Sequence, residues 1–144
     1  LSGAINASRS MLRSMTNKIS SYKAATKAFP SSQSIPLMEE ILALELKVQA
    51  VNIALNGDRT YNQLDKDGDY STSQRAQSAI FDVFGSSSNI TKTSLNGYDI
   101  AANEFAPVLE QIRGLMDNFS QMDQKLDQIG APLTPNRLPN WKKQ

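Results

Sequence analysis

A helical repeat is clearest in residues 37–55, which read Leu37-Met38-Glu39-Glu40-Ile41-Leu42-Ala43-Leu44-Glu45-Leu46-Lys47-Val48-Gln49-Ala50-Val51-Asn52-Ile53-Ala54-Leu55. Apolar residues recur there at intervals of three and four, a spacing that lines one face of an α-helix. The positions on that face are Leu37, Ile41, Leu44, Val48, Val51 and Leu55. A second apolar flank consists of Met38, Leu42, Leu46 and Ile53. A helix that is apolar over so wide an arc predicts burial between at least two neighbours.

The ends of this helix carry their own signals. Ser34 suits the N-cap, and Pro36 falls in the first turn, where its missing N–H costs nothing. Asn56-Gly57 suits a left-handed C-terminal cap. The sequence therefore predicts a helix over residues 35–55.

The same repeat precedes this segment, and Pro30 ends it. Two wider gaps in the repeat are filled by the small residues Ser8 and Thr26. The apolar positions are Ile5, Leu12, Met15, Ile19, Tyr22 and Phe29. We expect a helix over residues 2–29 with this buried face.

A third helix is predicted over residues 72–84. Ser71 and Gln74 form a capping-box pattern before it, and Gly85 follows it. Its expected inner face is Ala76, Ile80, Val83 and Phe84. Because this helix is short, its stability must come from packing.

The longest helix is predicted over residues 93–129. Its apolar stripe is read as Leu95, Tyr98, Ala102, Phe105, Leu109, Ile112, Met116, Phe119, Met122, Leu126 and Ile129. Pro107 lies inside the helix, so we expect a kink or a break over residues 103–106. The spacing changes phase near Phe119, which predicts a redirected lower half.

A proline-rich strap is predicted over residues 130–144. Gly130 stops the long helix, and Pro132, Pro135 and Pro139 exclude further helix. We expect Leu133, Leu138 and Trp141 to cover the open end of the helices. Short connections favour antiparallel neighbours, so the prediction is an all-α, up-and-down four-helix bundle forming a single domain over residues 1–144.

Composition argues against several classes of function. Lys and Arg total 15 against 14 for Asp and Glu, so no bulk charge favours nucleic acid. The chain has no Cys and no His, which removes thiol chemistry, the usual general base and the commonest metal ligand. No apolar run approaches the length of about 20 residues needed for membrane insertion. We therefore expect no enzyme in this chain and no catalytic, cofactor-binding or metal residues.

The one segment that imitates a metal site is Asp65-Lys66-Asp67-Gly68-Asp69, with three carboxylates at alternating positions. Calcium-binding loops use such oxygen ligands. The EF-hand pattern also needs Gly where Tyr70 stands and a bidentate acid where Ala76 stands. A solvated acidic turn is the preferred interpretation, with cation binding by Asp65 to Asp69 left open.

Two stretches resemble a known family: Asn103-Glu104-Phe105-Ala106-Pro107-Val108-Leu109, and Gly130-Ala131-Pro132-Leu133-Thr134-Pro135-Asn136-Arg137-Leu138-Pro139-Asn140-Trp141. They are similar to the C-terminal helical region of bacterial secreted sortilin-like proteins with BNR-type β-propeller repeats, often labelled glycosyl hydrolases. Residues 55–58 and 80–85 add to the likeness. Leu133 and Asn136 depart from it, since Trp and Gly are common at those places in the family.

The resemblance implies a place for this chain in a larger protein. A propeller and a small β-domain would precede it, would be its partners, and would carry any glycosidase-like chemistry. It also implies export, to a secreted, periplasmic or cell-surface location. The functional hypothesis is thus a non-catalytic C-terminal accessory domain that supports structure or mediates interaction. The alternative is a stand-alone helical adaptor whose apolar second helix binds a partner helix or self-associates into a homo-oligomer.

Overall fold

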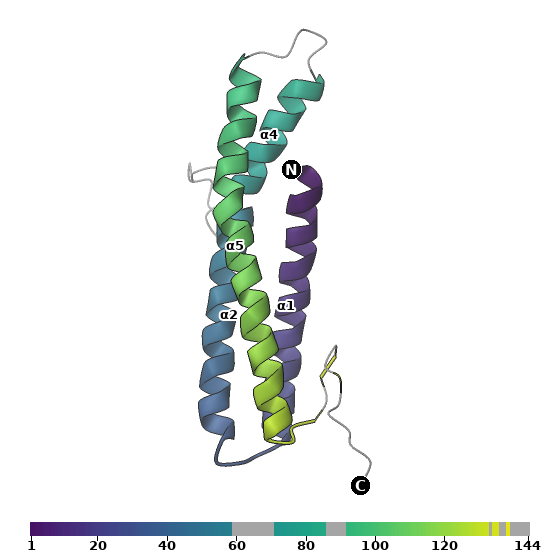
Figure 1. The fold of residues 1–144 in the computed structure, drawn as a ribbon, viewed down its shortest axis with the longest axis vertical. Coiled ribbons are helices and arrows are strands. Elements are labelled where there is room, and N and C mark those ends of the chain that lie inside the picture. Colours follow the sequence, from purple (N-terminus) through teal and green to yellow (C-terminus); the bar gives the residue numbers. More distant parts are fainter. Residues whose placement is uncertain (59–70, 86–91, 133, 136–137, 139–144) are drawn as a thin grey trace. The chain divides into compact units, whose positions relative to one another are not determined.

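The computed structural model describes residues 1–58, 71–85, 92–132, 134, 135 and 138. Four helices account for most of them: α1 (Ser2–Ala28), α2 (Ser34–Asn56), α4 (Thr72–Gly85) and α5 (Lys92–Gln128), as drawn in Figure 1. No strand occurs in these ranges. The predicted all-α helical bundle with a long last helix is confirmed, and each predicted helix end lies within one residue of the observed end.

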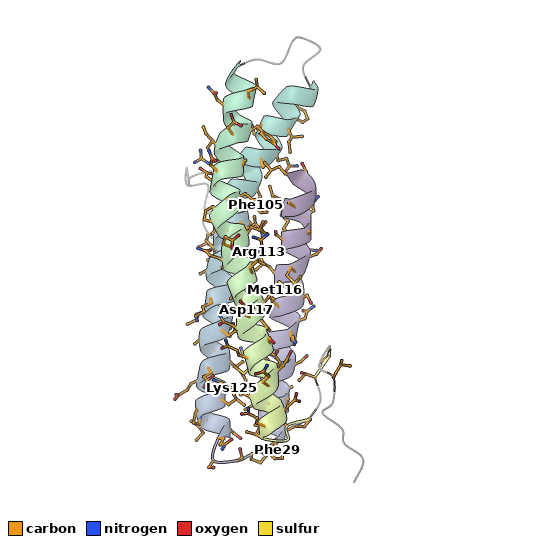
Figure 2. All side chains as sticks on the ribbon, in the orientation of Figure 1. Phe29, Phe105, Arg113, Met116, Asp117 and Lys125 are labelled. Carbon is orange, nitrogen blue, oxygen red and sulfur yellow. The ribbon has the colours of Figure 1, made fainter. Side chains whose placement is uncertain are left out.

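The predicted buried face of α1 is confirmed at nearly every position. Ser8 and Thr26 are buried in the two wide gaps between apolar residues, as expected for small side chains at a helix contact. The buried positions of this face are Ile5, Ser8, Leu12, Met15, Ile19, Tyr22 and Thr26. Phe29 was predicted wrongly, because α1 ends one residue earlier and its ring is 36% exposed (Figure 2).

On α2 one apolar face is buried and the other is not. All six residues of the predicted first face are buried: Leu37, Ile41, Leu44, Val48, Val51 and Leu55. The second flank contradicts the prediction, since Leu42, Leu46 and Ile53 are exposed and Met38 is only half-buried. Neighbouring helices therefore cover α2 on one side, which leaves the opposite side to solvent.

Helix α5 buries five of its predicted stripe positions, Phe105, Ile112, Phe119, Met122 and Leu126, and differs from the prediction at the others. Its buried positions are Ala101, Phe105, Val108, Ile112, Leu115, Phe119, Met122 and Leu126. These alternate by four and three throughout, so the predicted change of phase near Phe119 is wrong. Leu95, Tyr98 and Met116 are exposed, while Ala102, Leu109 and Ile129 are half-buried. A sustained seven-residue repeat of this kind also describes the buried faces of α1 and α2, and is typical of helices packed as in bundles.

Pro107 does not interrupt α5, which is helical from Lys92 to Gln128. The predicted break over residues 103–106 is therefore wrong, although the predicted kink stays a prediction. Pro107 is exposed, so its ring does not displace a core side chain. Helices tolerate such a proline when packing on the opposite face holds them together.

The described helices divide between two compact units. The first unit comprises Leu1–Met11 and Gln49–Ile112, and the second comprises Leu12–Val48 and Arg113–Gln144. Each unit contains segments that are far apart in the sequence. That the whole chain acts as a single domain stays a prediction.

The second unit packs large side chains from α1, α2 and α5. Tyr22, Ile19 and Ile41 are almost completely buried, as is Leu126. The rings of Tyr22 and Phe119 lie with centroids 5.8 Å apart in a tilted arrangement, which is favourable for aromatic pairs. Between α1 and α2 the chain turns over a few residues at the lower end of the view in Figure 1. In that turn the Ser34 hydroxyl donates to the carbonyl oxygen of Phe29 at 2.8 Å.

The first unit packs smaller side chains where α4 meets its neighbours. Ser73, Ala76 and Ala79 are buried on α4, and Ala101 is buried on α5. A Cβ placed on Gly97 of α5 would lie 3.5 Å from Cβ of Ala79, which shows how closely the two helices approach. Of the predicted inner face of α4, Ala76 is buried and Ile80 half-buried. The side chains of Val83 and Phe84 lie outside the described part.

The end of α5 follows the predicted glycine cap. Gly130 has a φ of 70°, a left-handed conformation that glycine adopts without strain. The N–H of Gly130 donates to Asp127 and that of Ala131 to Leu126, which is the Schellman pattern. Ala131 and Thr134 are buried beyond it, whereas Leu138 is 88% exposed and does not cover the helices as predicted. Leu133 and Trp141 lie outside the described residues.

Candidate interaction surfaces

In the second unit, charged side chains bridge neighbouring helices. Nζ of Lys18 lies 2.6 Å from Oδ2 of Asp123, joining α1 to α5. The hydroxyl of Tyr22 donates to Oδ1 of the same carboxylate at 2.5 Å and also lies 3.2 Å from the carbonyl oxygen of Phe119. Both oxygens of Asp123 are thus occupied by α1. A carboxylate held in this way fixes the register of the two helices. Both of its oxygens already accept hydrogen bonds, so it is not an unpartnered general base.

Two further ion pairs connect α2 to its neighbours in this unit. Nζ of Lys23 lies 2.6 Å from Oε2 of Glu45, joining α1 to α2. Lys125, near the C-terminal end of α5 (Figure 2), pairs with Glu40 of α2. These pairs are partly exposed, so each contributes little to stability, about 0–1 kcal/mol. Their positions are informative, because Glu40 and Glu45 each face a base on a neighbouring helix.

In the first unit, Asn56 is the centre of a polar network. Its Oδ1 accepts from Nε of Arg9 at 2.7 Å and from the Ser73 hydroxyl at 3.3 Å. Its Nδ2 donates to Oδ1 of Asn52 at 2.8 Å. Asn56 is the last residue of α2, so this side chain links α1, the end of α2 and the start of α4. The cationic Arg9 also suits the negative end of the α2 macrodipole.

The start of α4 shows the predicted capping box. The N–H and the hydroxyl of Ser71 both donate to Oε1 of Gln74, at 2.9 and 3.0 Å, and the N–H of Gln74 donates back to the Ser71 hydroxyl at 3.3 Å. The Thr72 hydroxyl adds a bond to the carbonyl oxygen of Ala54 on α2. The polar residues around this helix start therefore satisfy backbone groups and dock α4, which is a structural role.

An open groove is found among the described residues of each unit. The groove of the second unit has a volume of about 170 Å³ and is lined by Glu40, Ala43, Leu44, Lys47, Asn118, Gln121, Met122 and Lys125. Its carboxylate, Glu40, is already paired with Lys125. The groove of the first unit has a volume of about 240 Å³ and includes Arg9 and Ser73, both bonded to Asn56. Neither lining offers a nucleophile beside a general base.

The described residues bear on the metal and membrane predictions only in part. Among the described residues, no cluster of three acidic side chains could hold a metal ion. The loop from Asp65 to Asp69 lies outside those residues, so cation binding there stays a prediction. In the same described ranges, no helix combines the length and apolar character needed to cross a membrane.

The exposed face of α2 is the most distinctive surface of the second unit. Ile35 is 74% exposed, Leu42 is 43% exposed and Leu46 is 66% exposed. These three residues, named the α2 stripe below, lie within about 40° of one another around the helix, at about 100° per residue. Further along the same helix, Ile53 continues their spacing and is 47% exposed. Apolar side chains gathered on one face mark an interaction surface more often than scattered ones do.

Sequence reasoning found Leu42, Leu46 and Ile53 but placed them in the core, and it did not identify Ile35. It did not find the Asp123 cluster or the Asn56 network. Their partners are 105 and 47 residues apart in the chain, as in the Lys18–Asp123 and Arg9–Asn56 bonds. No local spacing signals such a contact, although Asn at the end of a helix indicated the cap itself.

Comparison of the chain with protein-family models, with curated proteins and with solved structures finds no match. Function therefore has to be inferred from the surfaces just described and from the sequence. The absence of catalytic and cofactor-binding residues in this chain stays a prediction.

Proposed function

We propose that this chain is a non-catalytic helical accessory domain, which supports or connects other parts of a secreted BNR-repeat, sortilin-like β-propeller protein. The observation that carries the non-catalytic part is the engagement of acidic side chains between helices. Asp123, Glu45, Glu40 and Glu104 each pair with a Lys or Arg on another helix. Catalytic acids instead have a perturbed pKa and lie inside a cleft that a substrate can enter.

The link to a propeller protein rests on the sequence resemblance of the C-terminal segment. The local structure supports one part of that likeness, since Gly130 ends α5 in a left-handed cap and the described residues beyond it, 131, 132, 134, 135 and 138, are not helical. Buried Ala131 and Thr134 indicate that the start of this segment packs against the protein, whereas Leu138 further along is exposed. These features support a strap that is anchored at its start, in the segment on which the likeness depends.

Two measurements test this proposal. Reading the gene upstream of the coding region for Leu1 should reveal BNR repeats and an export signal, and finding neither would contradict the placement. The chain itself should not turn over fluorogenic glycosides or esters. Turnover that is abolished by a carboxylate substitution such as Glu104→Gln, and retained in the matched exposed variant Glu110→Gln, would contradict the non-catalytic role.

A second candidate function is a helical adaptor that binds a partner through the α2 stripe. The exposure of Ile35, Leu42 and Leu46 favours it, because a helix that served only an internal core would present polar residues on its outer face. An environment-sensitive apolar dye separates the candidates. Strong dye binding that is lost in Leu46→Lys supports an adaptor surface, whereas no dye binding by the chain argues against it.

A further inference from the structure

We propose that the α2 stripe is a self-association surface, which pairs in antiparallel fashion with the α2 stripe of a second copy of this chain. The pairing is independent of the propeller proposal, since it would serve an accessory domain and a stand-alone adaptor equally. Three features of α2 lead to it: the symmetry of the apolar spacing, the position of two charges beside the stripe, and the engagement of the remaining acids.

The apolar spacing of α2 reads the same in both directions. Leu42 and Leu46 stand two residues before and after Leu44, and Ile35 and Ile53 stand nine residues before and after it. A two-fold axis that passes beside Leu44, perpendicular to the helix, therefore places Leu42 of each copy opposite Leu46 of the other copy. Symmetric homodimers require such a self-complementary patch. Leu44 itself points away from this surface and is buried in the second unit.

Charges beside the stripe favour the antiparallel arrangement. At about 100° per residue, Glu39 and Lys47 lie on the same side of the stripe, about 40° and about 120° from its centre. Residues on one side of an antiparallel pair face each other, so Glu39 of one copy lies within about 3 Å along the axis of Lys47 of the other, from a rise of about 1.5 Å per residue. In a parallel pair in register, Glu39 of one copy and Lys47 of the other would lie on opposite sides of the interface and would not meet.

The two charges are available for this contact. Among the described residues, neither Glu39 nor Lys47 has an ion-pair partner. The other acids near the stripe, Glu40 and Glu45, are held by Lys125 and Lys23. The stripe thus has a free acid at its rim, Glu39, and further round the same side a long, exposed base, Lys47, which a second copy complements in both places.

The first test is the mass of the full chain in solution, measured by sedimentation equilibrium from micromolar to millimolar concentration. We expect a monomer–dimer equilibrium. Leu46→Lys should raise the dissociation constant by about 100-fold. The dimer then loses the burial of two leucine side chains, one from each copy, and must desolvate two ammonium groups instead. The matched control is Met116→Lys, an exposed apolar residue of α5 outside the stripe, which should leave the constant unchanged.

The second test is a charge reversal read in the same experiment. Lys47→Glu should weaken the dimer by about tenfold at low salt, because two attractive pairs become repulsive. The double variant Glu39→Lys/Lys47→Glu should restore the wild-type constant. Circular dichroism at a concentration where the chain is monomeric should give unchanged melting for every variant, since all four positions are on the surface.

Three results would overturn the proposal. The first is a wild-type chain that stays monomeric up to about 1 mM, which is the weak end of the affinity range. The second is a dimer that Leu46→Lys does not weaken. The third is a double reversal that does not restore pairing. Each is distinct from a failure of the propeller proposal, which depends on the upstream gene and on turnover assays.

Discussion

The two compact units follow the same seven-residue repeat but are held together differently. The second unit buries large side chains such as Tyr22, Phe119 and Leu126, and bridges its helices with ion pairs. The first unit has small residues where α4 docks and an amide, Asn56, that links three helix segments. One repeat therefore underlies the buried faces of both units, whereas side-chain size and polar partners set how strongly each unit is held.

The largest expected effect is on the large-residue core of the second unit. Leu126→Ala should lower the free energy of unfolding by about 2–5 kcal/mol, because the residue is fully buried and the cavity cannot collapse completely. Chemical denaturation gives the change, and hydrogen exchange locates it. Leu138→Ala is the control, since Leu138 is almost fully exposed. Equal losses in both variants would contradict this account of the core.

The next effect concerns the amide network of the first unit. Asn56→Ala should cost about 1–3 kcal/mol, because Nε of Arg9 loses its acceptor in a part-buried position. Gln49→Ala, on the exposed surface of the same helix, should change stability little. If exchange rates near Ser73 and Arg9 are the same in Asn56→Ala and wild type, the network does not dock α4.

A smaller effect is expected for the phenol of the second unit. Tyr22→Phe should lower stability by about 0.5–1.5 kcal/mol, since the hydroxyl bonded to Asp123 is lost while the ring is kept. Tyr98→Phe is the matched control because Tyr98 is exposed. A thermal melt of both variants checks the difference, and a Tyr22→Phe chain as stable as Tyr98→Phe would remove the role given to this bond.

The smallest predicted effect is a gain. Gly97→Ala should stabilise the first unit by up to about 1 kcal/mol, because alanine favours helix and its Cβ would meet Ala79 at an ordinary contact distance of 3.5 Å. Gly114→Ala in the second unit meets nothing within 4 Å and should gain a similar amount. A loss for Gly97→Ala beside a gain for Gly114→Ala, measured by denaturation, would show that the α4–α5 contact tolerates no added methyl.

How far the sequence predicted the fold depended on how each helix marks its buried face. On α1 the face was predicted correctly apart from Phe29, because hydrophilic residues fill the positions between Leu12 and Met15 and between Met15 and Ile19. On α5 five positions of the stripe, among them Phe105 and Ile112, were predicted correctly. Other positions were wrong, because Leu109 and Met116 resemble core residues as much as Val108 and Leu115 do. Periodicity cannot separate adjacent apolar residues when the choice is made by neighbouring helices.

The surfaces were harder to predict than the helices. The second apolar flank of α2 was recognised, but its burial was inferred from its width, and the structure leaves Leu42 and Leu46 exposed. Sequence spacing reports which residues share a helix face and says nothing of whether another helix covers it. The bridges of Asp123 and Asn56 depend on contacts between distant segments, which a single sequence does not encode locally.

The seven-residue repeat shared by α1, α2 and α5 also limits how the length of this chain can vary. Removing one residue within a helix turns everything after it by about 100°, which carries core side chains such as Leu126 to the surface. Removing seven turns it by only about 20°. Insertions and deletions accepted in these helices should therefore come in sevens, with matching changes in the helices that face them, while single-residue changes should be confined to the connections.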